Sequence, residues 1–160
     1  MKQGTIYTSS REETLALATR FAHALHGGEI IFLRGPIGAG KTVFVKGIAA
    51  ALGLKSSPTS ASFSLMKKYH NKKHRLFHID LFRLSAGEVF NLGFEEMLED
   101  EEAIILAEWP DPIAHMLPSD RLEMDFILRQ GDEREIKLSS FGRISDILLE
   151  DLCKQAKTSL

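Results

Sequence analysis

The sequence lacks several features that would assign it to whole classes of protein. Its 160 residues include one cysteine, Cys153, which excludes an internal disulfide. Basic and acidic residues nearly balance at a formal net charge of −2, so no overall field favours nucleic acid or a membrane surface. No apolar run approaches the roughly 20 residues of a membrane span, and residues 1–7 lack the apolar segment of a signal peptide. We therefore expect a cytoplasmic protein with no membrane contact.

Internal repeats, low-complexity segments and linkers are also missing, so we expect residues 1–160 to form one domain. Ser10 and Glu13 form a capping box that predicts the start of a helix, which Gly27-Gly28 ends. Further helices are predicted at 43–52, at 85–100 with a break near Gly93, and at 144–153. The last of these is expected to carry Cys153 on its inner face as a small core residue.

The most informative motif is residues 35–42, which read Gly-Pro-Ile-Gly-Ala-Gly-Lys-Thr and fit the phosphate-binding pattern GxxxxGK[ST]. A predicted strand precedes the motif and a predicted helix follows it. Backbone N–H groups in such a loop, together with the helix dipole, favour a polyphosphate. The pattern predicts that Lys41 reaches the β- and γ-phosphates and that Thr42 ligates Mg²⁺. The predicted cofactor-binding residues of this loop are Gly35, Pro36, Ile37, Gly38, Ala39, Gly40, Lys41 and Thr42.

Apolar and alternating patterns predict the strands. They are expected at 29–34, 63–69, 75–80, 103–107, 121–128 and 133–138. Turn residues at 71–73 and 130–132 join two pairs of these strands into hairpins. The early strand–helix–strand order implies parallel pairing with right-handed crossovers. We therefore predict an α/β fold: a P-loop NTPase-like sheet with a parallel core, antiparallel hairpin edges and helices on both faces.

Two acidic residues end apolar strands of this sheet. Asp80 ends the run 76–80 and Glu108 ends the run 103–108. The carboxyl edge of a parallel sheet is where an α/β fold presents its ligand crevice. One carboxylate is predicted to hold Mg²⁺, directly or through water, and the other to orient the attacking water; either could instead cap a nearby turn. Trp109 follows, either as a core anchor or as a lid over the nucleotide site.

Four stretches of the chain resemble the TsaE (YjeE) family, the bacterial ATPases of tRNA threonylcarbamoyladenosine biosynthesis. They are Glu13-Thr14-Leu15, the phosphate loop, His78-Ile79-Asp80-Leu81-Phe82-Arg83-Leu84 and Glu108-Trp109-Pro110. Their spacing fits the family over essentially the whole chain. Three positions depart from it. Pro36 replaces an aspartate of the loop, and in the segment that matches the family's S-P-T-[FY], Ala61 replaces the proline and Ser62 the threonine. The nearby Thr59 leaves open a shifted register for that switch hydroxyl.

This resemblance implies an ATPase that uses ATP and Mg²⁺. Lys41 and the loop backbone would hold the phosphates, while Thr42, Glu108 and Asp80 would surround Mg²⁺. Further nucleotide contacts would come from Ser10, Thr14, Ser62, Trp109 and Arg134. The resemblance also implies a partner, a TsaD–TsaB-like complex that transfers a threonylcarbamoyl group to adenosine 37 of tRNA and is reset by ATP hydrolysis.

Other functions stay open on the residues alone. A small-molecule or nucleoside kinase shares the loop but needs a phosphate-clamping lid, and the stretch available for one, 95–102, is acidic. A non-catalytic ATP-binding module of an assembly is a second alternative. A GTPase is disfavoured because residues 71–74 end in His74 and do not complete N-K-x-D. One predicted hairpin is basic, with Lys67, Lys68, Lys72, Lys73 and Arg75. Two interpretations of these residues stay open: contact with an RNA backbone, or solvated lysines at the tip and edge of a hairpin.

Overall fold

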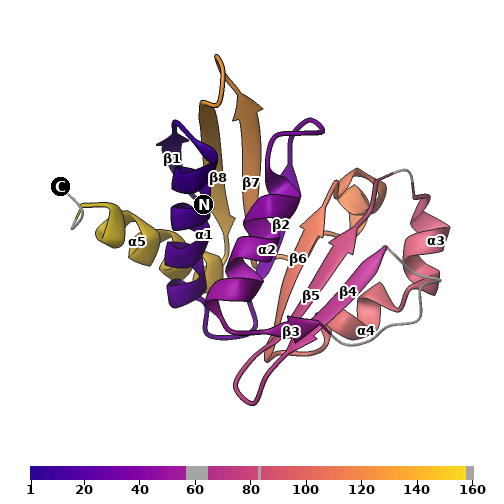
Figure 1. Ribbon diagram of the computed structural model, residues 1–160. Coiled ribbons are helices and arrows are strands. Elements are labelled where there is room, and N and C mark those ends of the chain that lie inside the picture. Colours follow the sequence, from indigo (N-terminus) through magenta and orange to yellow (C-terminus); the bar gives the residue numbers. More distant parts are fainter. Residues whose placement is uncertain (57–64, 83, 158–160) are drawn as a thin grey trace.

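The computed structural model describes residues 1–56, 65–82 and 84–157, with residues 155–157 described by their backbone alone. Eight strands form one sheet in the order β1-β8-β7-β2-β6-β5-β4-β3 (Figure 1). The strands are β1 (Lys2–Thr8), β2 (Ile30–Arg34), β3 (Lys55–Ser56), β4 (Met66–His70), β5 (Arg75–Asp80), β6 (Ala103–Glu108), β7 (Arg121–Leu128) and β8 (Arg134–Phe141). The helices are α1 (Arg11–Ala24), α2 (Lys41–Ala51), α3 (Ala86–Asn91), α4 (Phe94–Leu98) and α5 (Arg143–Lys157), with the 3₁₀ helix η1 (Asp111–Met116).

The sheet has a parallel centre and antiparallel edges. Strands β7, β2, β6 and β5 pair in parallel. The β7–β8 and β4–β5 hairpins flank this centre, and β1 and β3 extend them antiparallel at the two edges. The predicted α/β class with a parallel core and hairpin edges is therefore confirmed.

Helices cover both faces of the sheet, as predicted. On one face α1, α2 and α5 pack against alternate strand residues, among them Ile31, Leu33 and Leu106. On the other face α3, α4 and η1 pack on the intervening residues, among them Phe32 and Ile105. This alternation is what period-two side-chain geometry requires of strands buried on both sides. Within the part of the chain that the structure describes, no helix is long and apolar enough to cross a membrane.

The ends of two predicted helices are set by the residues that the sequence singled out. Ser10 is the N-cap of α1, and its hydroxyl accepts a hydrogen bond from the Glu13 backbone N–H at 3.1 Å. The Glu13 carboxylate accepts from the N–H of Ser9, one residue before the position that a capping box uses. Gly93 separates α3 from α4 with a left-handed φ of 72°, so the break predicted there is confirmed.

Other expectations were wrong or incomplete. Cys153 is exposed, because the inner face of α5 is formed by Leu148, Leu149 and Leu152. Strand β1 was not predicted, because its residues are mostly exposed or half-buried and so have no strong apolar pattern. Lys55–Ser56 forms the edge strand β3, which was not predicted. The predicted strand 63–69 begins in the described part at Met66, and residues 57–64 lie outside it.

Candidate functional site

The predicted site residues meet where three parallel strands end. Strand β2 leads into the phosphate loop, β5 ends at Asp80 and β6 ends at Glu108. In the strand register Asp80 lies opposite Glu108, and Glu108 lies opposite Leu33 of β2. The two carboxylates therefore flank the loop at the carboxyl edge of the sheet, as the sequence predicted.

The phosphate loop has the backbone shape that a polyphosphate requires. Gly35 has a left-handed φ of 131°, and a Cβ atom there would lie 2.4 Å from the carbonyl oxygen of Phe126, so the position accepts only glycine. Gly38 and Gly40 also have positive φ, at 80° and 100°, and a Cβ atom at either position would meet nothing within 4 Å. The loop thus opens toward solvent and ends directly at the N-terminus of α2. This arrangement fits the phosphates of a nucleotide.

Pro36 and Ile37 complete the loop in different ways. The Pro36 carbonyl accepts a hydrogen bond from the Ala39 N–H at 3.2 Å, which closes the turn. Proline has no N–H, so this loop offers one backbone donor fewer than it would with an aspartate at the same position. Ile37 is 72% exposed at the loop tip and contributes an apolar rim to the site.

Lys41 is buried and held by the loop itself. Its ammonium donates to the carbonyl oxygens of Gly35 at 2.6 Å and Pro36 at 2.9 Å. The same ammonium lies 4.1 Å from the centre of the Trp109 ring. Burial lowers the pKa of Lys41 below the usual value for lysine, against the opposing effect of the Glu108 and Asp80 carboxylates. Lys41 is therefore positioned under the loop with its charge poorly solvated, which favours an anionic ligand.

Glu108 is the most enclosed acidic group of the site. Its side chain is 3% exposed, and its two oxygens accept the Thr42 hydroxyl at 2.9 and 3.1 Å. One of them, Oε1, also lies 2.8 Å from Nε2 of His78. A hydroxyl and a carboxylate provide the oxygen ligands that Mg²⁺ prefers, so the pair fits the predicted metal position.

Asp80 performs two roles in the geometry. Its Oδ1 accepts a hydrogen bond from the Phe82 N–H at 3.0 Å, so the residue caps a turn, which was one of the open interpretations. It also lines a cavity of about 290 Å³ together with Thr42 and Glu108. Asp80 therefore lies beside Thr42 and Glu108, the residues with which it was predicted to group.

Trp109 lies on the wall of this cavity and not in either hydrophobic core. Its φ of 59° makes it the one residue other than glycine with positive φ among those that the structure describes. The ring stacks at a tilt on Phe82 with 4.8 Å between centroids. Its backbone N–H donates to the Leu33 carbonyl at 3.0 Å, which ties this strained position to β2. The geometry favours a lid over the site and not a core anchor.

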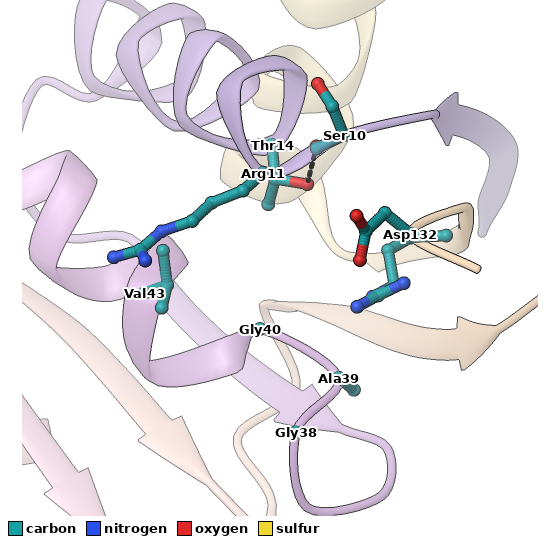
Figure 2. A pocket seen from close by; sticks show the side chains of 9 residues that line it. Ser10, Arg11, Thr14, Gly38, Ala39, Gly40, Val43 and Asp132 are labelled. Carbon is teal, nitrogen blue, oxygen red and sulfur yellow. Dashed lines mark hydrogen bonds between the residues drawn. The ribbon is translucent and has the colours of Figure 1, made fainter.

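A second cavity, of about 230 Å³, lies between the loop and the start of α1 (Figure 2). The predicted residues Ser10, Thr14 and Arg134 line it together with Gly38, Ala39 and Gly40. Figure 2 shows the start of α1, with Ser10 and Thr14, facing the loop across this cavity. The Thr14 hydroxyl donates to the Ser10 carbonyl at 3.1 Å. The cavity has room for the nucleoside part of a nucleotide whose phosphates lie on the loop.

Several residues of the site were not predicted from the sequence, among them Val43 and Phe82, which line the cavities. Arg11 and Asp132 line the second cavity, and His78 contacts Glu108. Asp132 lies in the predicted turn 130–132, so its place beside the loop follows only from the strand order. His78 was present in the family motif without a role. Ser62 and its alternative Thr59 fall outside the described residues.

Comparison with known proteins identifies the family. The family model described as threonylcarbamoyl adenosine biosynthesis protein TsaE matches residues 8–136. The chain is 34% identical to the tRNA threonylcarbamoyladenosine biosynthesis protein TsaE of Bacillus subtilis over 99% of both chains. It is 36% identical to the protein of the same name from Rickettsia bellii over 79% of this chain and 88% of that one. The crystal structure of Bacillus subtilis YdiB matches with a TM-score of 0.81 and 33% identity over 97% of each chain. With its phosphate loop, its two strand-end carboxylates and these matches along most of its length, the chain belongs to the TsaE family.

Proposed function

We propose that this chain is a Mg²⁺-dependent ATPase required for threonylcarbamoylation of adenosine 37 in tRNA. The observation that carries the proposal is the meeting of Lys41, Thr42 and Glu108 at one end of the phosphate loop. Family membership supports the tRNA-modification role, since relatives bear that name. The groups that meet at this site support the ATPase part of the proposal, which the family name does not describe.

Each residue has a role that its position supports. The loop N–H groups and the Lys41 ammonium would bind the phosphates and stabilise the charge that develops on them. The Thr42 hydroxyl, with Glu108 and Asp80, would hold Mg²⁺, which neutralises phosphate charge when it is bound. The carboxylate of the two that is not engaged with the metal would orient the attacking water. Trp109, above Lys41, would exclude other water from the site.

The competing enzyme functions have less support in the fold. Asp100 and Glu102, from the stretch considered as a kinase lid, pair with Arg75 at the amino end of β5, whereas Asp80 lies at its carboxyl end. Residues 71–74, considered as a guanine-reading motif, form the turn just before β5 and are equally remote from the loop. A non-catalytic ATP-binding module is the second alternative, and phosphate release distinguishes it from an ATPase.

Removal of the Lys41 charge tests the proposal. Lys41→Ala should abolish ATP hydrolysis, measured as phosphate release, because the ammonium under the loop is lost. Lys46→Ala is the matched control, since Lys46 lies on the same helix with an exposed side chain. If Lys41→Ala hydrolysed ATP as fast as Lys46→Ala does, the assignment of the site would be overturned. ATP binding without any phosphate release by wild type, alone or with partners, would favour the non-catalytic module.

The partner in this proposal is a TsaD–TsaB-like complex. We expect slow hydrolysis by the chain alone and faster hydrolysis when that complex and tRNA are added. Equal rates with and without them would count against the partner role. Phosphate transfer to a small molecule would instead establish a kinase.

A direct tRNA contact through the basic hairpin has partial support. Arg75 is engaged by Asp100 and Glu102, whereas Lys67, Lys72 and Lys73 form no ion pair with any residue that the structure describes. Lys72 and Lys73 are neighbours in the turn between β4 and β5, and Lys67 lies near the other end of β4. Unneutralised lysines along one hairpin favour a phosphate backbone. Reversal of Lys67 and Lys72 to glutamate should weaken stimulation by tRNA more than stimulation by the protein complex alone, and an unchanged tRNA effect would exclude this surface.

A further inference from the structure

A buried histidine, His78, lies against the metal-binding side of the site. It stands on β5 two residues before Asp80, and its side chain is 8% exposed. Strand alternation turns His78 and Asp80 to the same face of the sheet, the face that α2 covers. His78 itself is opposite Leu106 in the neighbouring strand β6, two residues before Glu108. The sheet register therefore brings the imidazole beside the Glu108 carboxylate.

The contact between the two side chains has a defined direction. Nε2 of His78 lies 2.8 Å from Oε1 of Glu108. The ionised carboxylate that the proposed metal site requires only accepts hydrogen bonds, so in that site Nε2 is the donor. The Thr42 hydroxyl donates to the same carboxylate from α2. Glu108 is thus held from two sides, by a residue of the sheet and by a residue of the loop helix.

The two donors are not equivalent once a metal is bound. Thr42 is itself the proposed Mg²⁺ ligand, so its orientation changes with the metal, whereas His78 is fixed in a strand. The Glu108 carboxylate is 3% exposed. Without the imidazole of His78, it would keep only the Thr42 hydroxyl as a donor, and that hydroxyl depends on the metal. Hydrogen bonds from a neighbouring side chain of this kind set the orientation of a ligating or water-orienting group.

From this geometry we propose that His78 is a positioning residue, which orients the Glu108 carboxylate toward Mg²⁺ and the attacking water. The proposal rests on the proposed function of the site. It predicts a defect in metal binding and turnover, with little effect on the grip of the loop on the nucleotide, because His78 does not line the phosphate loop cavities.

Two substitutions separate hydrogen bonding from packing. His78→Leu keeps an apolar group of similar size and removes the donor. His78→Gln keeps a donor, since the glutamine amide nitrogen lies the same number of bonds from Cβ as Nε2 of histidine. His74→Leu is the matched control, because His74 is also buried but lies before β5, at the end remote from Glu108.

Mn²⁺ binding to the protein–ADP complex, followed by electron paramagnetic resonance, gives a readout that does not depend on turnover. We expect His78→Leu to weaken Mn²⁺ binding by about 10- to 100-fold, the usual effect of losing such a partner. The metal-free affinity for ADP should change by less than about twofold, and kcat should fall while the KM for ATP stays similar. His78→Gln should recover most of the loss, and His74→Leu should bind Mn²⁺ like wild type.

Several results would overturn the proposal. Mn²⁺ affinity and kcat of His78→Leu equal to wild type would exclude a positioning role. Equal losses in His78→Leu and His78→Gln would show that the ring packs and does not orient. A wild-type protein that fails to bind Mn²⁺ and ADP together would overturn the proposed function as well, whereas normal wild-type binding confines the failure to His78.

Discussion

At Gly47 the helices α1 and α2 lie so close that a methyl group does not fit. A Cβ atom there would lie 2.8 Å from Cβ of Ala18 and 3.2 Å from Cδ2 of Leu15. Carbon atoms in contact normally stay about 3.5–4.0 Å apart, so Gly47→Ala requires the two helices to separate by about 1 Å. Ala18 is fully buried, and the separation must therefore spread into the core.

Two opposing effects set the magnitude. Alanine in place of a helical glycine stabilises a helix by about 1 kcal/mol, whereas overpacking a core typically costs roughly 1–3 kcal/mol. We expect Gly47→Ala to lower the free energy of unfolding by up to about 2 kcal/mol, measured by urea denaturation. Gly87→Ala in α3 is the matched control: a Cβ there meets nothing within 4 Å, so the same change should be neutral or stabilising by up to about 1 kcal/mol.

The same displacement should reach the proposed nucleotide site. The N-terminus of α1 carries Ser10 and Thr14, and α2 begins at the phosphate loop, so the two helices hold opposite walls of the second cavity. Gly47→Ala should therefore weaken ADP binding measured by calorimetry, while Gly87→Ala leaves it unchanged. Adding Ala18→Gly should relieve the contact and give a favourable coupling energy in a double-mutant cycle. A Gly47→Ala protein as stable as Gly87→Ala, or a coupling energy near zero, would refute this reasoning.

Three further predictions concern the site. Glu108→Gln keeps the shape of a buried carboxylate and removes its charge, so phosphate release should fall by at least about 100-fold while ATP binding persists; near-normal turnover would remove Glu108 from its role. Trp109 is the single tryptophan, and its fluorescence emission should change when ATP draws the Lys41 ammonium away from the ring. Lys41→Met should show the changed emission without ATP. Identical emission spectra of Lys41→Met and wild type, both without ATP, would contradict the contact. Burial lowers the pKa of Lys41, so the unfolded chain binds more protons than the folded one at alkaline pH. The stability of the ligand-free protein, measured by thermal melting, should therefore rise with pH between that lowered pKa and 10.5. Lys41→Met should lose this rise. The affinity for ATP should fall over the same pH range.

The elements that the sequence predicted are those with strong local signals. Residues 35–42 combine glycine spacing, a preceding apolar strand and a following helix, and each signal points to the same loop. Asp80 and Glu108 could be placed together because parallel strands end at one edge, so two strand-end acids converge. Ser10 carried a capping signal that depends on a few neighbouring residues.

What the sequence could not predict depends on contacts between distant segments. Asp132 lines the cavity near Ser10 only because β8 lies between β1 and β7 in the sheet, an order that no local pattern reveals. His78 contacts Glu108 because of the register between β5 and β6, and the two residues are 30 positions apart in the sequence. The prediction that Cys153 faces the core was wrong. The sequence of an amphipathic helix does not show which residues at the edge of its apolar stripe are buried.

The pairing of β1 with β8 joins the first strand of the chain to the last. Lys2 lies opposite Ser140 and Thr8 opposite Arg134, so the strand that leads into Ser10 reaches its place only after β8 has been made. The hydroxyls of Thr8 and Thr14, 3.0 Å apart, tie this strand to the first turn of α1. Such long-range closure slows folding, and it leaves one wall of the second cavity unformed until β8 has been made. A nascent chain would therefore carry the phosphate loop well before it could hold a whole nucleotide.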